Sequence, residues 1–453
     1  MRRQLLRHAY SAGWVLAVPL ALLYLLKRSL RQPEYRLHWA ERFGFCDPPP
    51  NGGQPIWIHA VSVGETAAAA PLIRELAARY PGAPVLLTHA TPTGRATGRD
   101  LFRELGPRLS QCYLPYDLPF CVGRFLDVQR PLFGLVMETE VWPNLMHAAS
   151  RRGVPMAVVN ARLSEKSLAR GLNYRSLIAP AVAAFDVIIA QSTADSARMA
   201  QLARPADAIV GNLKFDQSVS ETARARGAQW RLRFGPRAVV VAASTRDGEE
   251  AILLQSWRRL REAAIESRRA LPLLLVVPRH PNRFDEVASL IGQAAPDYRL
   301  LRRAALDQPA ADIAGCDVLL GDSMGEMQSW YAAADVAIMG GSLLPYGSQN
   351  LIEANGLGCP VVLGPSVFNF EQAAQESIAA GASVQVADAD AAVAAALRIA
   401  HDGAVRAAMS QAAERFAQAH RGATARTLAA LAPLLTRAMP DEAVREEAGT
   451  GDG

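Results

Sequence analysis

The stretch IWIHAVSVGE, residues 56–65, joins an apolar strand to the start of a helix and decides the fold class. Residues 56–61 form a short apolar run, and Gly64 allows the backbone to turn sharply after it. Ser62 is placed to cap a helix that begins near Thr66. The order of strand, turn and helix therefore predicts a unit of an α/β fold.

The same order recurs along both halves of the chain. We expect strands at 56–61, 84–90, 132–137, 154–160 and 187–190, and again at 238–243, 273–277, 318–320, 336–339 and 360–363. Uniformly apolar strands separated by helices indicate a parallel sheet that is buried on both faces. Ligands bind such sheets beyond the carboxyl ends of the strands, so the chemistry is expected in the loops there.

A chain of 453 residues is too long for one ordinary core and suits two domains. Residues 31–215 are expected to form the first Rossmann-like domain and residues 237–437 the second, with a cleft between them. Residues 216–236 are polar and rich in Arg and Gln, which favours an interdomain linker. Residues 438–453 have the composition of a disordered tail.

The N-terminus, residues 1–30, is expected to anchor the protein to a membrane. Residues 9–26 contain no charged side chain, and this length is just adequate for a span. A cleavable signal peptide needs small residues after the apolar run, where this chain has Lys-Arg-Ser-Leu-Arg. Charges at both ends disfavour a buried core helix. These charges are Arg2, Arg3 and Arg7 before the apolar run and Lys27, Arg28 and Arg31 after it. Because positive charge flanks both ends, it stays open whether the segment spans the membrane or lies in one leaflet.

Composition excludes several other classes of protein. The five cysteines are dispersed without a CxxC pair, which disfavours a disulfide framework and indicates a reducing compartment. The net charge of +5 is spread along the chain, so no nucleic-acid partner is expected. No metal site is expected, because the pair Asp388 and Asp390 is read as a helix cap. No GxGxxG follows a strand, which disfavours a nicotinamide or flavin cofactor.

Three acids lie at strand ends of the first half. Glu65 stands at a helix start, where it is either a simple capping residue or a general base for transfer to a hydroxyl. Glu138 and Glu140 follow the strand at 132–137, either as solvated cap residues or as a polar site for a sugar. Thr93, Arg95 and Arg162 offer polar groups to the same region.

The second half offers turns suited to a phosphate group at successive strand ends. Each turn taken alone is more simply an ordinary helix cap, but four in one domain favour a nucleotide site. Arg279 is a candidate phosphate ligand, because a guanidinium matches two phosphate oxygens. Glu353, three residues after Asn350, could accept hydrogen bonds from ribose hydroxyls. The turns are ASTR (243–246), PRHP (278–281), GDSMGEM (321–327) and GGS (340–342).

Taken in order, these segments resemble the 3-deoxy-D-manno-oct-2-ulosonic acid (Kdo) transferase family. The resemblance runs from the anchor to about residue 372, and the joint order of the motifs is highly specific. Besides the apolar N-terminus and the four turns above, the matching segments are RLHWAERFGF (36–45), WIHAVSVGE (57–65), TPTG (91–94), YLPYD (113–117), ETEVWPN (138–144), NARLS (160–164) and GNLKFD (211–216).

The resemblance implies a GT-B glycosyltransferase: two doubly wound Rossmann-like domains facing a cleft, with an N-terminal hydrophobic anchor helix. It implies an inverting, metal-independent transfer of Kdo from CMP-Kdo to a lipid A precursor (lipid IVA) in lipopolysaccharide core biosynthesis, without a cofactor. The enzyme would lie at the inner (cytoplasmic) membrane with its catalytic domains facing the cytoplasm.

The resemblance also assigns site residues. Glu65 is the expected catalytic base, with Glu138, or failing that Glu140, as a second catalytic acid. The donor positions are Ser244, Pro278, Arg279, Met324, Gly325, Glu326, Asn350 and Glu353. Candidates for sugar or acceptor contacts are Thr93, Arg95, Arg162 and Lys214, with the three basic residues left as alternatives for the Kdo carboxylate.

One departure from the family pattern bears on donor contacts and activity. Many relatives carry histidines in the loop before Asn350, where this chain has Tyr346 and Gln349. The Asn350/Glu353 pair is unaffected.

Three alternatives remain open. A related two-domain enzyme, either another nucleotide-sugar transferase or a sugar epimerase, would share the fold. A non-catalytic relative would bind CMP or lipid without turnover. A dinucleotide-dependent oxidoreductase is the most distant alternative. The number of Kdo residues transferred does not follow from these motifs.

Overall fold

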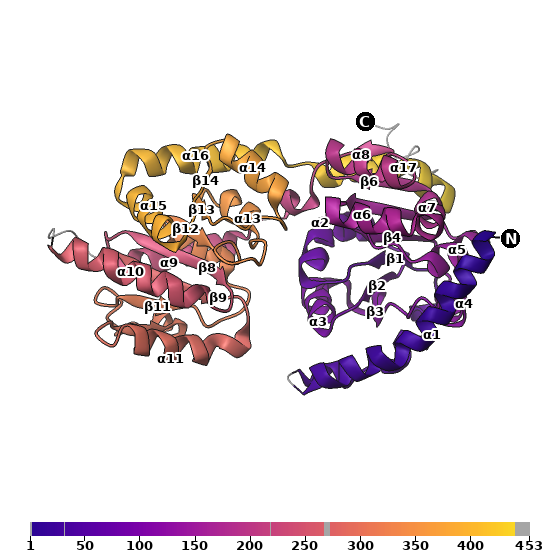
Figure 1. Ribbon diagram of the computed structural model, residues 1–453, viewed down its shortest axis with the longest axis horizontal. Helices are drawn as coiled ribbons and strands as arrows, with labels where there is room; N and C mark the ends of the chain where they lie inside the picture. Colours follow the sequence, from indigo (N-terminus) through magenta and orange to yellow (C-terminus); the bar gives the residue numbers. More distant parts are fainter. Residues whose placement is uncertain (1, 31, 218, 267–271, 440–453) are drawn as a thin grey trace. The chain divides into compact units, whose positions relative to one another are not determined.

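The computed structural model describes residues 2–30, 32–217, 219–266 and 272–439. The chain divides into two compact units, one formed by residues 1–217 and 422–453 and the other by residues 218–421. Within the described residues each unit holds a seven-stranded sheet whose strands are all parallel (Figure 1). The α/β, doubly wound architecture is therefore confirmed.

The first sheet has the order β3-β2-β1-β4-β5-β6-β7. Its strands are β1 (Ile56–His59), β2 (Val85–His89), β3 (Leu109–Tyr113), β4 (Phe133–Met137), β5 (Met156–Ala161), β6 (Val187–Ala190) and β7 (Ala208–Ile209). The helices of this unit are α1 (Arg2–Ser29), α2 (Val63–Arg79), α3 (Pro92–Leu101), α4 (Pro119–Gln129), α5 (Pro143–Arg151), α6 (Glu165–Asn173), α7 (Arg175–Ala183), α8 (Thr193–Leu202) and α17 (Ala423–Ala438).

Both faces of the first sheet are buried, which explains the unbroken apolar runs. Successive side chains of a strand point to opposite faces. Ile56 and Ile58 accordingly pack in one core cluster, while Trp57 packs in the other and meets Phe125 with ring centroids 5.2 Å apart.

The second sheet has the order β10-β11-β9-β8-β12-β13-β14. Its strands are β8 (Val239–Thr245), β9 (Leu273–Pro278), β10 (Leu300–Arg302), β11 (Val318–Leu320), β12 (Val336–Met339), β13 (Val361–Leu363) and β14 (Ser383–Gln385). The helices are α9 (Glu221–Phe234), α10 (Glu249–Glu266), α11 (Phe284–Ala294), α12 (Met327–Ala333), α13 (Leu351–Gly356), α14 (Glu371–Ala379), α15 (Ala389–His401) and α16 (Gly403–Ala419).

The strand order reverses beside the first strand of each sheet. In the first unit, β1 pairs with β2 on one side and with β4 on the other. In the second, β8 pairs with β9 and β12. Since ligands of such sheets bind at this reversal, the loops after these six strands are where each unit is expected to hold its ligands.

The short strands β3, β7, β10 and β14 were not predicted. They are the edge strands of the two sheets, and most of their residues are only half-buried or exposed. A strand that is not enclosed on both faces lacks the continuous apolar run by which the central strands were recognised.

Two domain boundaries differ from the expected ones. Residues 216–236 are not a bare linker, because α9 packs on α12, where Gly227 fits against Ala332 and Trp230 lies 4.3 Å from Trp330, centroid to centroid. The second domain also ends before residue 437. Helix α17 returns to the first unit and buries leucines in its core, and Asp216 accepts the Gly422 N–H at 2.7 Å. Of the expected tail 438–453, residues 440–453 lie outside the described ranges.

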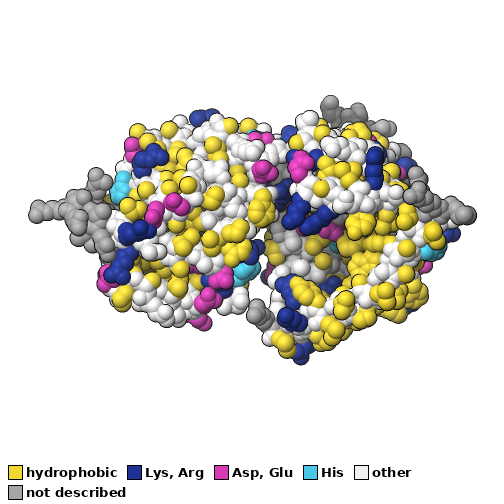
Figure 2. Space-filling view, in the orientation of Figure 1, with side chains coloured by type: hydrophobic (Ala, Val, Ile, Leu, Met, Phe, Trp, Pro, Cys, Tyr) yellow, Lys and Arg dark blue, Asp and Glu magenta, His cyan; other side chains and the backbone are white. Residues whose placement is uncertain are grey.

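Helix α1 is the one helix of the described chain that is long and apolar enough to cross a membrane, judged by length and composition. It lies on its own unit, where Ser11 Oγ is 3.0 Å from Asn144 Nδ2 and the Trp14 ring is 6.1 Å from that of Trp142. Its outer face is exposed and apolar, and Figure 2 shows hydrophobic side chains along it with basic ones near one end. Its exposed large hydrophobic side chains are Leu5, Val15, Leu16, Leu20, Leu23, Tyr24 and Leu26.

Candidate functional site

Glu65 closes the turn between β1 and α2 with a reciprocal capping arrangement. The Val61 N–H and the Ser62 hydroxyl donate to its carboxylate at 2.8 and 3.0 Å, and the Glu65 N–H faces Ser62 Oγ at 3.4 Å. These contacts satisfy donors that a helix start leaves unpaired. The capping interpretation of Glu65 is thus confirmed, and the contacts also hold its carboxylate in one position.

The carboxyl group of Glu65 has an unusual affinity for protons. Burial raises its pKa to about 7, and the charge of Glu138 acts in the same direction, with a smaller effect from Glu140. The hydrogen bonds from Val61 and Ser62 oppose this rise but do not cancel it. A carboxyl group with a pKa near neutrality can accept a proton from a reacting group and later release it, as a general base must.

Glu138 lies directly after β4 and is held beside a cation. Its backbone adopts a positive φ of 57°, while its N–H donates to the Val159 carbonyl at 3.0 Å. Its carboxylate forms an ion pair with Lys214 Nζ at 3.4 Å. A left-handed conformation at a residue other than glycine is uncommon and costs free energy, and such strain concentrates at functional sites.

Glu140 lies close enough to share this electrostatic environment. Its pKa is raised by burial first and by the charge of Glu138 second. The structure therefore brings together the three acids from the ends of β1 and β4, with Lys214 from the segment Leu213–Asp216 as a neighbouring cation.

Asp117 holds the segment that carries Glu138 and Glu140. Its carboxylate accepts the N–H groups of Asn144 and Leu145 at 2.9 and 2.8 Å and so caps α5. Burial raises the pKa of Asp117 to about 6. The motif 113–117 was recognised in the sequence without a role for this aspartate, because its partner helix begins far along the chain.

The other expected contacts of the first unit lie in different surroundings. Arg95 binds Glu41 at 2.6 Å and the Gln111 carbonyl at 3.1 Å, so its guanidinium is engaged inside the domain. Thr93 is exposed on α3. The backbone N–H of Arg162 donates to the Thr139 hydroxyl at 3.2 Å, which joins the ends of β4 and β5.

In the second unit, the ends of β8 and β12 approach closely. Ser244 has a φ of 57°, and a Cβ atom added at Gly340 would collide with the Ser244 carbonyl oxygen. Only glycine fits at position 340 for this reason. The positive φ coincides with an irregularity in the register between β8 and β9, from Ala243 to Thr245.

Glu249 organises the loop after β12, a role that the sequence did not reveal. Its buried carboxylate accepts the N–H of Gly341 at 2.6 Å, of Leu343 at 3.0 Å and of Arg246 at 2.9 Å. A glutamate at a helix start reads as an ordinary cap, and its loop partners lie more than 90 residues away.

A group of cations surrounds the ends of β8 and β9. Burial lowers the pKa of Arg279, and the charge of Arg246 lowers it further, whereas Glu353 acts the other way. The pKa of His280 is lowered by burial and then by its arginine neighbours. Arg283 is instead neutralised, since it binds the buried Glu250 at 2.8 Å.

Asn350 and Glu353 begin the next helix. Asn350 Oδ1 accepts the Ile352 N–H at 3.2 Å and caps α13. Burial raises the pKa of Glu353, while a hydrogen bond with Gln328 and, to a smaller extent, the charge of Arg279 oppose the rise. Arg279 and Glu353 are thus electrostatic neighbours, and Pro278 is the buried last residue of β9 beside them.

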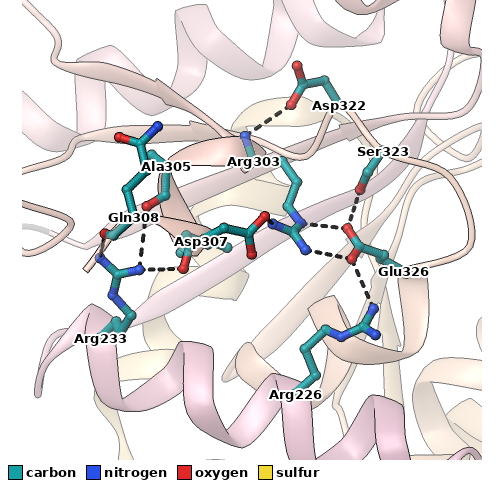
Figure 3. A network of polar contacts seen from close by, with 10 residues as sticks. Arg226, Arg233, Arg303, Ala305, Asp307, Gln308, Asp322, Ser323 and Glu326 are labelled. Carbon is teal, nitrogen blue, oxygen red and sulfur yellow. Dashed lines mark hydrogen bonds and ion pairs between the residues drawn. The ribbon is translucent and has the colours of Figure 1, made fainter. Parts of the chain in front are cut away.

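The turn at residues 321–327 is held by an ionic network, drawn in Figure 3. Arg303 donates to Glu326 at 2.7 and 2.8 Å, and Arg226 from α9 donates to the same carboxylate at 2.9 Å. Asp322 accepts the Arg303 N–H at 3.0 Å. Between these anchors Met324 is 58% exposed.

Gly325, at the tip of this turn, has a φ of 77°, which favours glycine. The Glu326 carboxylate is bound by two arginines. It would therefore affect a ligand indirectly, by fixing the position of the turn. No group of three His, Cys, Asp or Glu side chains suited to a metal ion lies within the described residues.

Comparison with known proteins identifies relatives along nearly the whole chain. A family described as 3-deoxy-D-manno-octulosonic-acid transferase (kdotransferase) matches residues 37–217. The 3-deoxy-D-manno-octulosonic acid transferase of Bordetella pertussis is 45% identical over 433 residues, covering 94% of this chain and 98% of the relative. The corresponding protein of Haemophilus influenzae is 35% identical over 439 residues, covering 95% and 99%.

A solved structure supports the fold. The crystal structure of a glycosyltransferase from Rickettsia africae superimposes with a TM-score of 0.55 at 12% identity, covering 86% of this chain and 99% of that one. At this identity the likeness concerns the fold alone, which is the α/β, GT-B-like fold of two domains that the family resemblance implied.

Proposed function

Because this chain belongs to the 3-deoxy-D-manno-octulosonic acid (Kdo) transferase family, we propose that it transfers Kdo from CMP-Kdo to a lipid A precursor, lipid IVA, in lipopolysaccharide core biosynthesis. The observation that supports this most is the Glu65 carboxyl group, fixed by two hydrogen bonds and carrying a pKa of about 7. Transfer to a sugar hydroxyl requires such a proton acceptor.

The proposed reaction is a direct displacement with inversion. Glu65 accepts the proton of an acceptor hydroxyl as that oxygen attacks the anomeric carbon of Kdo. The bond between this carbon and the phosphate oxygen breaks, and CMP leaves with the electron pair. Glu138 raises the basicity of Glu65, and Lys214 limits the negative charge that gathers there. No metal ion takes part in this scheme.

The donor is proposed to bind the second unit. Arg279 would hold the phosphate, and its charge would stabilise the leaving group as negative charge develops. Met324 and Gly325 would present the backbone of the 321–327 turn, with Glu326 fixing that turn. Glu353 and Asn350 would meet the ribose hydroxyls, near the strand ends that carry Ser244 and Pro278.

In the first unit, Lys214 and Arg162 are the candidates for sugar or acceptor contacts that lie near Glu138. Lys214 is paired with Glu138 itself, and Arg162 is joined to Thr139. Arg95 is a poorer candidate, because its guanidinium already binds Glu41. Thr93 remains a candidate for the acceptor by its exposure.

The acceptor is a lipid, and α1 is proposed to hold the enzyme at the inner membrane with both units in the cytoplasm. Its exposed apolar face suits the acyl region, while Lys27 and Arg28 at its exposed end suit anionic headgroups. Deleting residues 1–30 should release the protein from sedimented membranes. If the shortened protein still sediments with membranes, another part of the chain must make the membrane contact.

The decisive experiment is mass spectrometry of lipid IVA incubated with CMP-Kdo and the purified full-length protein. We expect one or more Kdo masses with the wild type, none above about a thousandth of that rate with Glu65→Gln, and unchanged CMP binding. Glu104→Gln, at an exposed ion pair with Arg74, is the matched control and should keep full activity. A wild type that binds CMP but yields no product would identify a non-catalytic relative. Near-normal transfer by Glu65→Gln would remove Glu65 as the base.

A further inference from the structure

Two arginines leave the second sheet side by side. Arg246 follows Thr245, the last residue of β8, and Arg279 follows Pro278, the last residue of β9. Thr245 and Pro278 are register partners, and the Arg279 N–H donates to the Thr245 carbonyl at 3.0 Å. Both side chains therefore start from the same point on the carboxyl edge of the sheet.

Arg246 is held in place by an aromatic ring. Its guanidinium carbon lies 4.7 Å from the centre of the Tyr346 ring. The Tyr346 hydroxyl donates to the Asp247 carbonyl at 3.0 Å, and the Tyr346 carbonyl accepts from Asn369 at 2.8 Å. A guanidinium stacked on a ring keeps its N–H edges open for a planar anion.

Neither guanidinium is neutralised. Across the parts of the chain that the structure describes, Arg246 and Arg279 make no side-chain hydrogen bond or ion pair with an acid, whereas nearby Arg283 binds Glu250 at 2.8 Å. Burial lowers the pKa of Arg279 most, and the charge of Arg246 lowers it further. Two like charges held together without a hydrogen-bonded acid are unfavourable, and an anionic ligand would relieve this cost.

The charged groups also follow an order. Glu353 and Arg279 influence each other, and Arg279 is influenced by Arg246, so Arg279 is the shared neighbour. Along CMP-Kdo the ribose hydroxyls, the phosphate and the sugar carboxylate follow one another. The order Glu353, Arg279, Arg246 complements this sequence, because a hydrogen-bond acceptor would face the ribose hydroxyls and the two cations would face the phosphate and the carboxylate.

We propose that Arg246, stacked on Tyr346, binds the carboxylate of the donor sugar, while Arg279 binds the donor phosphate. The inference rests on the proposed function and extends it, since it explains selection of an acidic sugar rather than a neutral one. A bidentate guanidinium–carboxylate pair supplies both charge and direction. Tyr346 acts as a positioning residue.

The test is calorimetric binding of CMP-Kdo and of CMP to the full-length protein, which requires no transfer. Arg246→Met should weaken CMP-Kdo binding about tenfold to a hundredfold. It should change CMP binding by less than about threefold. Arg279→Met should weaken both ligands, and exposed Arg398→Met is the control that should change neither. A CMP-Kdo methyl ester, which lacks the carboxylate charge, should bind wild type and Arg246→Met alike.

Equal weakening of CMP and CMP-Kdo by Arg246→Met would assign Arg246 to the phosphate and overturn the inference, as would no change in either. A wild type that prefers UDP-N-acetylglucosamine to CMP-Kdo would instead defeat the proposed function, so the two failures are distinguishable.

The role of Tyr346 has its own test. Tyr346→Leu should weaken CMP-Kdo binding about twofold to fivefold, which is the contribution expected of a guanidinium stacked on a ring. CMP binding should stay unchanged. Tyr346→Phe keeps the ring and should restore most of the loss. Equal affinity in all three proteins would show that the ring does not position Arg246.

Discussion

The clearest prediction concerns the pH dependence of transfer and its control by Glu138. With the pKa of Glu65 raised from its usual 4.5 to about 7, the carboxylate form is lost as the pH falls below neutrality. At pH 5.5 only about 3% of a group with this pKa is ionised, against about 90% of an ordinary glutamate. The rate at pH 5.5 should therefore be roughly a thirtieth of the plateau above pH 8.

Replacing Glu138 by Gln removes a negative charge that favours protonation of Glu65. The pKa of Glu65 must then fall, so the acidic limb of the profile moves to lower pH. A fall of one unit, from about 7 to about 6, raises the ionised fraction at pH 5.5 from about 3% to about 24%, so the rate relative to the variant's own plateau rises about eightfold. Glu140→Gln should move the limb in the same direction by less, because the influence of Glu140 on Glu65 is the smallest of those identified.

The assay is kcat/KM for lipid IVA at saturating CMP-Kdo, measured from pH 5 to 9 and normalised to each variant's plateau. Glu104→Gln, an exposed acid in the same unit, should leave the profile unmoved. A wild-type rate that is flat between pH 5.5 and 7, or a limb that stays in place in Glu138→Gln, would refute the assignment of Glu65 as a base tuned by Glu138.

Three further variants test how the second unit is built. Arg303→Met should loosen the 321–327 turn and raise KM for CMP-Kdo several-fold while kcat changes less, as steady-state kinetics will show. Arg283→Met leaves Glu250 buried without its partner and should cost about 3–5 kcal/mol in a urea unfolding experiment; a cost below about 1 kcal/mol would contradict the buried pair. Gly340→Ala forces the ends of β8 and β12 apart and should weaken donor binding and lower the unfolding temperature, whereas Gly292→Ala, with open space around it, should not.

Local patterns of the sequence predicted the central strands and the residues that follow them. Buried parallel strands need an unbroken apolar run, and strand ends at a reversal of order collect polar side chains. Glu65, Glu138, Arg279 and Glu353 became candidate site residues in this way, and the ordered motifs then indicated the family. The edge strands were missed because most of their residues are only half-buried or exposed and carry no such pattern.

Packing between distant segments decided the rest. The basicity of Glu65 depends on burial and on Glu138, which lies 73 positions further along the chain. From the sequence, Glu249 is interpreted as a helix cap. In the structure its carboxylate also binds the loop after β12. Tyr346 first stands out as a departure from the family pattern. In the structure the guanidinium of Arg246 lies over its ring.

The sequence by itself thus determined the fold class, the identity of the acids and arginines at the strand ends, and the family. Only the tertiary structure decided which of those groups act on one another, and that α17 belongs to the first unit. The physical reason is the separation along the chain of the residues that determine each property. Strand and helix patterns repeat every few residues, whereas burial, charge and hydrogen bonding at a site depend on neighbours contributed by remote parts of the chain.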